Sequence, residues 1–333
     1  MDTDLSLDLP EAWDSPETSL GHDAARPEDD FGTAVLKGLA HRPRSLPCRF
    51  LYDARGSELF EEITKLDEYY PTRVETALLE AHGAEIAELA GPGRALIEFG
   101  SGSSRKTSLL LGALKRVPAY VPIDISPESL QEAAEWLAKR HPRLQIVPRI
   151  ADFITTRSLP FAAQGWPKLG FFSGSTIGNL GHVDARNFLT NAARLLGPGS
   201  KFLVGVDLKK SPSILIPAYN DAHGVTAAFN LNLLARINRE LGGTFDTSRF
   251  AHDAVWNETQ GRMEMYLVSL AEQIVGVAGR ACSFARGERI HTENSHKYSV
   301  EAFQALARAG GWHPVKAWTD PDRLFSLHLL RVS

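Results

Sequence analysis

The chain has 333 residues and a formal net charge of -4, with 43% hydrophobic and 23% charged residues. This is the balance of an ordinary globular protein, with enough material for one large domain or two. The net charge of -4 does not indicate a basic surface that would bind nucleic acid. No apolar run is long enough to span a bilayer. We therefore expect neither nucleic acid nor a membrane as a partner.

The cysteines and the N-terminus bear on the cellular compartment. Cys48 and Cys282 are the two cysteines and lie far apart, which argues against a disulfide framework or a metal cluster. The histidines lack the spacing of a two-histidine-plus-acid metal site. A signal peptide begins with basic residues that are followed by an apolar run. The first residues of this chain are acidic, so no signal peptide is expected. We expect a cytoplasmic protein with reduced thiols, no metal and no obligate protein partner.

The N-terminal part of the chain is predicted to contain a leader and then helices. Residues 1–30 combine three prolines with many Asp and Glu residues, which indicates a disordered leader. Apolar residues at helical spacing then predict helices over 31–39, 57–66 and 72–89. Residues 67–71 form a loop that ends in a proline suited to a helix start.

From residue 94 onward the predicted elements alternate between strand and helix. Strands are expected over 95–99, 119–125, 144–150, 169–173 and 201–207. Helices are expected over 106–114, 127–140 and 185–196. Such alternation is typical of a parallel sheet with helices on both faces, so the predicted fold class is α/β.

After Asp207 this alternation ends. A mainly helical stretch is expected over 214–240, strands over 250–257 and 262–275, a polar segment over 288–295, a helix over 301–309, and final strands over 312–318 and 325–332. We therefore predict a second subdomain inserted late in the sheet order and joined by the residues before about Arg73.

A glycine-rich loop follows the first strand of the alternating region. Residues 98–104 read Glu-Phe-Gly-Ser-Gly-Ser-Ser, and such small residues let the backbone approach a ligand at the mouth of a sheet. The loop lacks the Lys-Ser/Thr ending of a P-loop and the third glycine of a dinucleotide fingerprint. A site for S-adenosylmethionine (SAM) fits better, and a nicotinamide-dependent oxidoreductase fits poorly. A tight turn without a ligand is the alternative.

Two further strand ends carry acidic residues. Asp124 ends the second strand and could accept hydrogen bonds from ribose hydroxyls, while Asp152 and Phe153 follow the third and could bind an adenine. Each aspartate could instead cap a helix. Because ligands of open α/β sheets collect at the carboxyl ends of the strands, three such ends in succession favour a nucleotide-like ligand.

Polar residues in the second half of the chain suggest an acceptor site. Asn179 follows the fourth strand and could hold a carboxylate and orient an amine, or could be a turn residue. Tyrosines outside the sheet region could bind a ligand or be half-buried packing residues. The cluster Glu293-Asn294-Ser295-His296 could be a solvated loop, and Met265 could belong to the core.

Five motifs in this order resemble the histidine-specific Nα-methyltransferases of ergothioneine biosynthesis, from about Phe31 to the C-terminus. They are Tyr-Asp-Ala-Arg-Gly-Ser-Glu-Leu-Phe at 52–60, Glu-Tyr-Tyr-Pro-Thr-Arg at 68–73, the glycine loop with Lys-Thr at 106–107, Gly-Ser-Thr-Ile-Gly-Asn-Leu at 174–180, and Glu-Asn-Ser-His-Lys-Tyr at 293–298. The resemblance implies a class I SAM-methyltransferase (Rossmann-like) sheet with an inserted α+β substrate-binding subdomain. The implied SAM-binding domain covers 74–207 and 297–333, and the implied substrate-binding subdomain covers 31–73 and 208–296.

The resemblance also implies roles for individual residues. The SAM site would contain Gly100, Lys106, Asp124, Asp152 and Phe153. The histidine would be held at its carboxylate and amine by Asn179 and Tyr219, with Tyr52 near the amine, and at its imidazole by Tyr69, Glu293 and Ser295, with Met265 near the ring. Asn294 would also bind the substrate. Tyr52 and Asn179 would be the catalytic residues.

The activity implied is SAM-dependent trimethylation of the α-amino group of L-histidine to hercynine. An imidazole carries two nitrogens and needs two polar partners, which Glu293 and Ser295 could supply. An indole would leave the buried Glu293 carboxylate poorly paired. The alternatives are an α-N-methyltransferase for a tryptophan derivative or tyrosine, and a SAM-binding sensor without catalytic activity.

Overall fold

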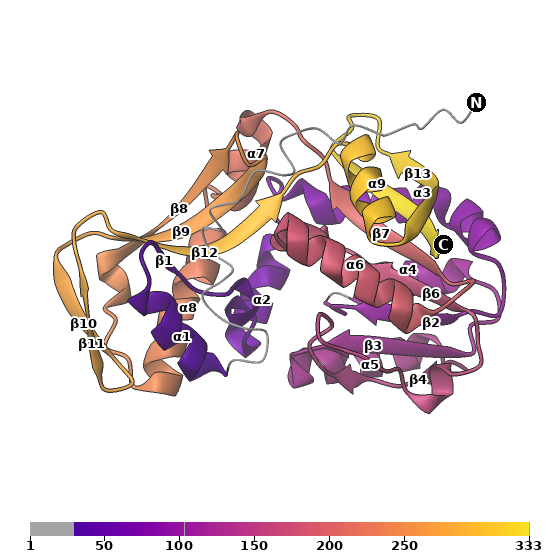
Figure 1. Ribbon diagram of the computed structural model, residues 1–333, viewed down its shortest axis with the longest axis horizontal. Coiled ribbons are helices and arrows are strands. Elements are labelled where there is room, and N and C mark those ends of the chain that lie inside the picture. The colour runs from indigo at the N-terminus through magenta and orange to yellow at the C-terminus, as the bar shows by residue number, and fades with distance from the viewer. Residues whose placement is uncertain (1–29, 103, 333) are drawn as a thin grey trace, which may run out of the picture.

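The computed structural model describes residues 30–102 and 104–332, and Figure 1 shows them as two lobes, each built on its own sheet. The predicted leader lies outside the described residues, except for Asp30. The Asp30 carboxylate accepts a hydrogen bond from the Thr33 backbone N–H at 2.7 Å and caps the first helix. Among the described residues, no helix has both the length and the apolar character needed to cross a membrane.

The larger lobe contains an eight-stranded sheet in the order β13-β14-β7-β6-β2-β3-β4, and β5 also pairs with β3. Its strands are β2 (Ala95–Phe99), β3 (Ala119–Asp124), β4 (Gln145–Ile146), β5 (Arg149–Ile150), β6 (Lys168–Phe172), β7 (Lys201–Asp207), β13 (Trp312–Thr319) and β14 (Phe325–Val332). Five strand pairs are parallel, namely β7–β6, β6–β2, β2–β3, β3–β4 and β3–β5. Strand β14 is antiparallel to both of its neighbours, β13 and β7. This sheet confirms the predicted α/β class I methyltransferase fold.

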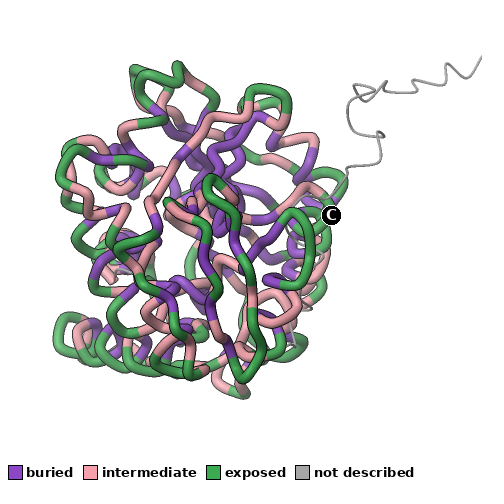
Figure 2. The backbone as a smooth tube through the Cα atoms, turned by 90° about the vertical axis from the view of Figure 1, so that its left-hand side faces the viewer, coloured by how far each residue is buried: buried purple, intermediate pink, exposed green. Residues whose placement is uncertain are grey.

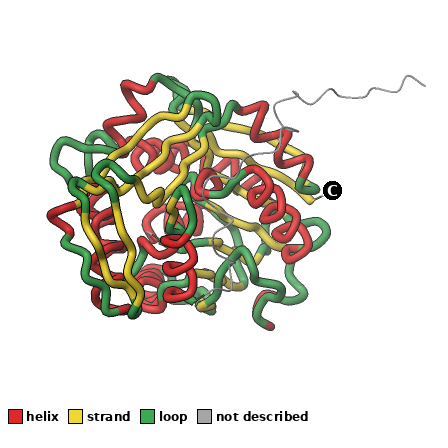
Figure 3. Tube along the Cα trace, turned by 60° about the vertical axis from the view of Figure 1, so that its left-hand side comes forward, coloured by secondary structure: helices red, strands yellow, loops and turns green. Residues whose placement is uncertain are grey.

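Helices cover both faces of this sheet, as Figure 3 shows. They are α3 (Tyr70–Ala90), α4 (Ser104–Ala113), α5 (Pro127–Arg140), α6 (His182–Leu196) and α9 (Val300–Ala309). Alternate residues of β2 separate the two apolar layers. Ile97 and Phe99 share a core with α6 and α9, while Leu96 shares one with α3, α4 and α5. In Figure 2 the buried backbone accordingly runs through the interior.

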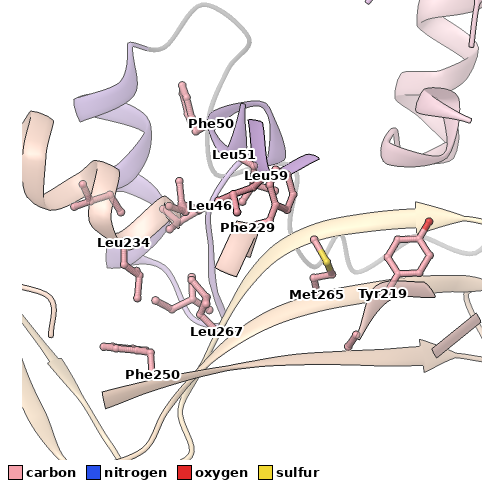
Figure 4. Packing of buried hydrophobic residues seen from close by; sticks show 14 of the residues in the cluster. Leu46, Phe50, Leu51, Leu59, Tyr219, Phe229, Leu234, Phe250, Met265 and Leu267 are labelled. Carbon is pink, nitrogen blue, oxygen red and sulfur yellow. The ribbon is translucent and has the colours of Figure 1, made fainter. Parts of the chain in front are cut away.

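The smaller lobe combines a four-stranded sheet in the order β1-β12-β9-β8 with a separate hairpin of β10 and β11. The strands are β1 (Arg44–Ser45), β8 (Phe250–Asn257), β9 (Arg262–Ser269), β10 (Gln273–Val277), β11 (Arg280–Phe284) and β12 (Arg289–His296). The helices are α1 (Phe31–Ala40), α2 (Ala54–Ile63), α7 (Pro212–Tyr219) and α8 (Val225–Leu241). Their apolar side chains form one core, shown in Figure 4.

Three predicted elements differ from the structure. The strand expected over 144–150 is divided into β4 and β5 around Pro148, whose ring removes a backbone donor. The strand expected over 262–275 ends at Ser269. The helix expected over 214–240 is broken before α8, where the Asp221 carboxylate accepts hydrogen bonds from the backbone N–H groups of Val225 and Thr226.

The largest correction concerns the polar segment over 288–295, for which a solvated loop was the alternative. This segment is β12, an inner strand of the smaller sheet, and its residues from Ile290 onward are buried. Its polar side chains therefore lie inside the protein, where each needs a partner or a ligand.

The two lobes meet where the chain passes between them. The Asp207 carbonyl accepts a hydrogen bond from the Tyr298 N–H at 3.1 Å, and the Lys209 N–H donates to the Tyr298 carbonyl at 2.9 Å. The short 3-10 helix η4 (Thr176–Asn179), which follows β6, packs against the end of β12. A Cβ atom on Gly178 would lie 2.7 Å from the His296 carbonyl oxygen, so glycine is required for this approach.

We predict that Gly178→Ala lowers the free energy of unfolding by about 1–3 kcal/mol, because a methyl group there forces η4 away from the β12 backbone. Gly112→Ala is the matched control. Gly112 is exposed near the end of α4 with open space around it, so alanine there should raise stability by about 0.5–1 kcal/mol. Urea unfolding measures both changes, and equal stabilities of the two variants would contradict the prediction.

Candidate active site

The glycine loop leaves β2 through Gly100, whose φ is +76°. This left-handed conformation favours glycine, and the Gly100 N–H donates to the Ile123 carbonyl at 2.8 Å. The neighbouring strand end supplies Asp124. Its carboxylate accepts hydrogen bonds from the backbone N–H groups of Ser101 and Ser126 at 2.9 and 3.0 Å. Asp124 therefore ties the glycine loop to the start of α5, in addition to any ligand it binds.

Asp152 and Phe153 follow β5, which pairs with β3 beside Asp124. One Asp152 carboxylate oxygen accepts a hydrogen bond from the Ile154 N–H at 2.8 Å, a local turn of the capping type. The Phe153 ring packs on Phe172 at a centroid distance of 5.4 Å, and a Cβ atom on Gly100 would lie 3.6 Å from a carbon of the Phe153 ring. The structure thus brings the predicted SAM-site residues of three strand ends together.

Lys106 lies beside this group in a buried ion pair that the sequence analysis did not predict. Its Nζ atom is 2.7 Å from a carboxylate oxygen of Glu75 in α3, and both side chains are buried. The same Glu75 oxygen accepts a hydrogen bond from the Gly174 N–H at 2.8 Å. Glu75 falls on the apolar face of α3 with Leu78 and Leu79, and a carboxylate at such a position is the signal that could have identified it.

A second buried carboxylate lies under the glycine loop. Glu98 in β2 accepts hydrogen bonds from the Thr107 hydroxyl at 2.8 and 2.9 Å and from the Tyr120 hydroxyl. Burial raises the pKa of this carboxyl to about 8, although both hydrogen bonds oppose the rise. Glu98 thereby fixes the start of α4 against β2 and β3, which sets the shape of the loop above it.

The predicted acceptor residues come mostly from β12. Glu293 and Ser295 are two residues apart, so their side chains lie on the same face of the strand. Glu293 is paired in register with Met265 of β9, which is buried in the core of the smaller lobe. Asn294 points to the opposite face, where its amide oxygen is 2.8 Å from His291 Nε2. The structure therefore does not bring Asn294 together with the other predicted acceptor residues.

Tyr219, at the end of α7, meets β12 from the side. Its hydroxyl is 2.7 Å from the Ser295 hydroxyl, and both oxygens accept hydrogen bonds from Lys297 Nζ at 2.7 Å. Lys297 also forms an ion pair of 2.6 Å with the Asp207 carboxylate at the end of β7. Figure 4 shows Tyr219 and Met265 at one end of the core, with the Tyr219 hydroxyl pointing away from the aliphatic side chains.

The Asp207 carboxylate also contacts Tyr70 and Lys210. Tyr70 donates to its carboxylate oxygens at 2.9 and 2.8 Å, and Lys210 lies at 2.5 Å. Burial alone would raise the pKa of Asp207, but the charges of Lys297 and Lys210 outweigh it and hold the pKa below its ordinary value. In the sequence Asp207 lies at a predicted strand end and Lys297 lies within a motif, and neither pattern indicates this network.

Glu293 shares one property with Glu75 among the carboxylates described above. One of its carboxylate oxygens is buried without a hydrogen-bond partner among the described residues. Burial raises the pKa of this carboxyl to about 7, while the charge of Lys297 opposes the rise. Buried polar atoms without partners are rare in proteins, and one beside the polar side chains of Ser295 and Tyr219 indicates a place for a ligand donor.

Two predicted tyrosines lie within electrostatic range of Glu293. Burial, followed by the charge of Glu293, raises the pKa of Tyr52 well above its usual value, and burial with the neighbouring Tyr219 and Glu293 does the same for Tyr69. The Tyr69 ring is 6.4 Å from that of Tyr219, and the Tyr52 ring packs edge-on to Phe229. Both phenols therefore remain protonated and can donate hydrogen bonds.

Asn179 is the last residue of η4 and is partly buried. The Ser175 hydroxyl, just before η4, accepts a hydrogen bond from the Asp207 N–H at 2.9 Å, so the loop is anchored to the end of β7. Together with the approach of Gly178 to β12, this anchor holds Asn179 at the junction of the two lobes. Among the described residues, no group of three or more His, Cys, Asp or Glu could hold a metal ion.

Comparison with known proteins agrees with this geometry. The family model described as "Histidine-specific methyltransferase, SAM-dependent" matches residues 31–332. The chain is 41% identical to a histidine N-alpha-methyltransferase of Mycobacterium tuberculosis, over 89% of this chain and 92% of the relative. It is 34% identical to ergothioneine biosynthesis protein 1 of Neurospora crassa, over 87% of this chain and 33% of that protein. It is 26% identical to a 4-dimethylallyltryptophan N-methyltransferase of Aspergillus fumigatus, over 92% of this chain and 94% of that protein.

A family model that spans the two lobes and a relative with two-fifths identity over nearly the whole chain establish the relationship. The chain belongs to the family of histidine-specific, SAM-dependent methyltransferases.

Proposed function

We propose that this protein transfers methyl groups from SAM to the α-amino group of L-histidine until the nitrogen is quaternary, as the first step of ergothioneine biosynthesis. The observation that carries the proposal is the buried Glu293 oxygen without a partner, two residues from the Ser295 hydroxyl on one face of β12. A carboxylate and a hydroxyl side by side suit the two ring nitrogens of an imidazole.

The glycine loop and the adjoining strand ends form the proposed donor site. Gly100 leaves room for the backbone to approach SAM, Asp124 accepts from the ribose, and Asp152 with Phe153 holds the adenine. Lys106 closes the side next to Gly174, where its charge suits the SAM carboxylate. The methyl group of SAM is already activated by its sulfonium, so the protein mainly aligns the reactants.

The amino-acid end of the proposed acceptor site lies near Asn179 and Tyr52. The Asn179 amide offers both a donor and an acceptor, and the protonated Tyr52 phenol can donate a hydrogen bond. The side chain of the acceptor reaches Tyr69, Glu293 and Ser295, with Met265 packed beside the ring. Because the Tyr219 hydroxyl is bonded to Ser295, we assign it to the ring end of the site.

In each transfer the lone pair of the neutral amine forms a C–N bond while the C–S bond breaks and its electrons return to sulfur. A free α-amino group has a pKa of about 8, so a usable neutral fraction exists near neutral pH without a dedicated base. After the first and second transfers the nitrogen loses a proton to water, and after the third it has none to lose. The products are hercynine and three molecules of S-adenosylhomocysteine.

The proposed reaction fits a reducing compartment, because Cys48 and Cys282 are both free thiols. We therefore propose a cytoplasmic enzyme whose substrates are two small molecules.

We expect trimethylated histidine as the main product when the protein is incubated with SAM and a mixture of aromatic amino acids. Mass spectrometry of the mixture identifies the acceptor, and S-adenosylhomocysteine should form at three molecules per hercynine. Trimethylated tryptophan or tyrosine as the main product would overturn the assignment, and one relative is named for a tryptophan derivative. Binding of SAM without any methylated product would instead indicate a sensor.

Glu293→Gln should raise the KM for histidine about 10- to 100-fold, because it removes a charge-assisted hydrogen bond to the ring. The KM for SAM should change little. Glu264→Gln is the matched control: Glu264 is also buried in the smaller sheet, but it is paired with Arg262 and Tyr266 on the other face. An unchanged histidine KM in Glu293→Gln would remove Glu293 from the proposed site.

The same two variants should respond oppositely in stability. The raised pKa of Glu293 means that the folded protein binds this proton more tightly than the unfolded chain. Its contribution to stability is therefore present below about pH 4.5 and is lost as the pH rises through about 7. Glu293→Gln should exceed the wild type at pH 8 by up to about 3 kcal/mol and match it near pH 4.5.

Glu264 has a lowered pKa in the fold, because its hydrogen bonds to Tyr266, Arg262 and Asn257 outweigh the effect of burial. Its contribution is present above the ordinary carboxyl pKa, so Glu264→Gln should destabilise the protein at pH 8. Thermal unfolding at several pH values measures both differences. A Glu293→Gln variant that is less stable than the wild type at pH 8 would contradict the environment described for Glu293.

A further inference from the structure

Tyr52 lies at a tight bend between the 3-10 helix η2 (Cys48–Leu51) and α2, and α8 packs against this bend. The Leu51 carbonyl approaches α2 so closely that a Cβ atom on Gly56 would lie 1.7 Å from its oxygen, so glycine is required there. Asp53 caps α2, and its carboxylate accepts a hydrogen bond from the Gly56 N–H at 2.8 Å. The backbone on both sides of Tyr52 is therefore constrained locally.

Three polar side chains of α8 bind the same segment. Arg236 Nη1 donates to the Phe50 carbonyl at 3.0 Å, two residues before the tyrosine. Asn232 Nδ2 donates to one Asp53 carboxylate oxygen at 2.7 Å, and Arg239 pairs with the other oxygen at 2.5 Å, directly after the tyrosine. Burial alone would raise the pKa of Asp53, but its hydrogen bonds, first among them that from Arg239, outweigh this and hold the pKa below its ordinary value. The Asp53 carboxylate is therefore ionised near neutral pH.

The ring of Tyr52 packs on the same helix. Its centroid is 5.4 Å from that of Phe229 in α8 and 5.5 Å from that of Phe60 in α2, both in edge-on geometry. The α8 residues that make these contacts follow one another at spacings of three or four positions and so line one face of the helix: Phe229, Asn232, Arg236 and Arg239. One helix face therefore contacts the ring of Tyr52 and holds the chain before and after it.

We propose that Asn232, Arg236 and Arg239 are positioning residues that hold the Tyr52 hydroxyl at the amine of the acceptor. The inference rests on the proposed function, because that function places Tyr52 beside the amine that receives the methyl groups. The three side chains act through the segment on either side of the tyrosine and not on the substrate. A displacement of about 1 Å at a reacting group costs up to about 100-fold in rate, so such a support matters for the reaction.

The test is a double-mutant cycle on kcat/KM for L-histidine at saturating SAM. The α8 variant combines Asn232→Ala with Arg239→Gln, which removes both α8 partners of Asp53 and leaves its cap on Gly56. We expect kcat/KM to fall about tenfold, while the Kd for SAM measured by calorimetry changes by less than about twofold. In a Tyr52→Phe background the same two substitutions should lower kcat/KM by about twofold or less, because the hydroxyl that they displace is gone.

This coupling separates positioning from a general loosening of the fold. A purely structural loss would lower kcat/KM by the same factor whether or not the Tyr52 hydroxyl is present. Equal losses in the two backgrounds would therefore overturn the inference. A Tyr52→Phe variant as active as the wild type would also overturn it, because the hydroxyl would then make no contribution that α8 could preserve.

Glu240→Gln is the matched control. Glu240 forms ion pairs within α8 with Arg236 at 3.1 Å and with Arg239 at 2.7 Å. Its substitution weakens these pairs but leaves the hydrogen bonds of both arginines to the Tyr52 segment, so kcat/KM should stay within about twofold of the wild type. A loss as large as that in the α8 variant would overturn the inference, because disturbance of the helix alone would then explain both results.

A second variant, Asp53→Asn, keeps the test decisive if the α8 variant does not fold. Asparagine still caps α2, but it loses the charge-assisted hydrogen bond to Arg239. It should lower kcat/KM about threefold with Tyr52 present and change it little in the Tyr52→Phe background. Equal losses would again overturn the inference. A wild type that does not methylate histidine would instead refute the proposed function, so the two failures are distinguishable.

Discussion

The Asp207 carboxylate is the interaction on which the arrangement of the site depends. It is fully buried at the end of β7, where it holds Lys297 and Lys210 by charge and Tyr70 by hydrogen bonds. These partners come from three places in the chain: the end of β12, the segment after β7 and the start of α3. A buried charge of this kind is tolerated only with such partners, so the large sheet, α3 and the end of β12 are held in one geometry.

Much of the fold could be predicted from the sequence because local patterns dominate there. The glycine loop after Phe99 and the helix start at Pro127 depend on small residues and proline, whose backbone preferences are intrinsic. The polar strand β12 could not be recognised in this way, because residues such as Glu293 and Asn294 resemble a solvated loop until a sheet covers both faces. Long-range pairing overrides local polarity at this strand.

For a related reason, some residues of the candidate site could be predicted from the sequence and others could not. Motifs contain the residues proposed to touch the two substrates; in the structure Gly100 and Asp124 lie at strand ends, and Glu293 is buried. The groups that hold them were missed. Glu75 is an example: its position on the apolar face of α3 indicates burial, but its pairing with Lys106, 31 positions away, does not follow from any local pattern.

The double crossing between the lobes has an evolutionary consequence. The chain leaves the large sheet at Leu208 and returns at Tyr298, and these two residues form a bridge with each other. Residues 209–297 therefore form one continuous segment whose two ends lie side by side. Such a segment can be lengthened, shortened or exchanged without rethreading the sheet. Much of the smaller lobe can therefore change by replacement of a single stretch of chain, while the large sheet stays unaltered.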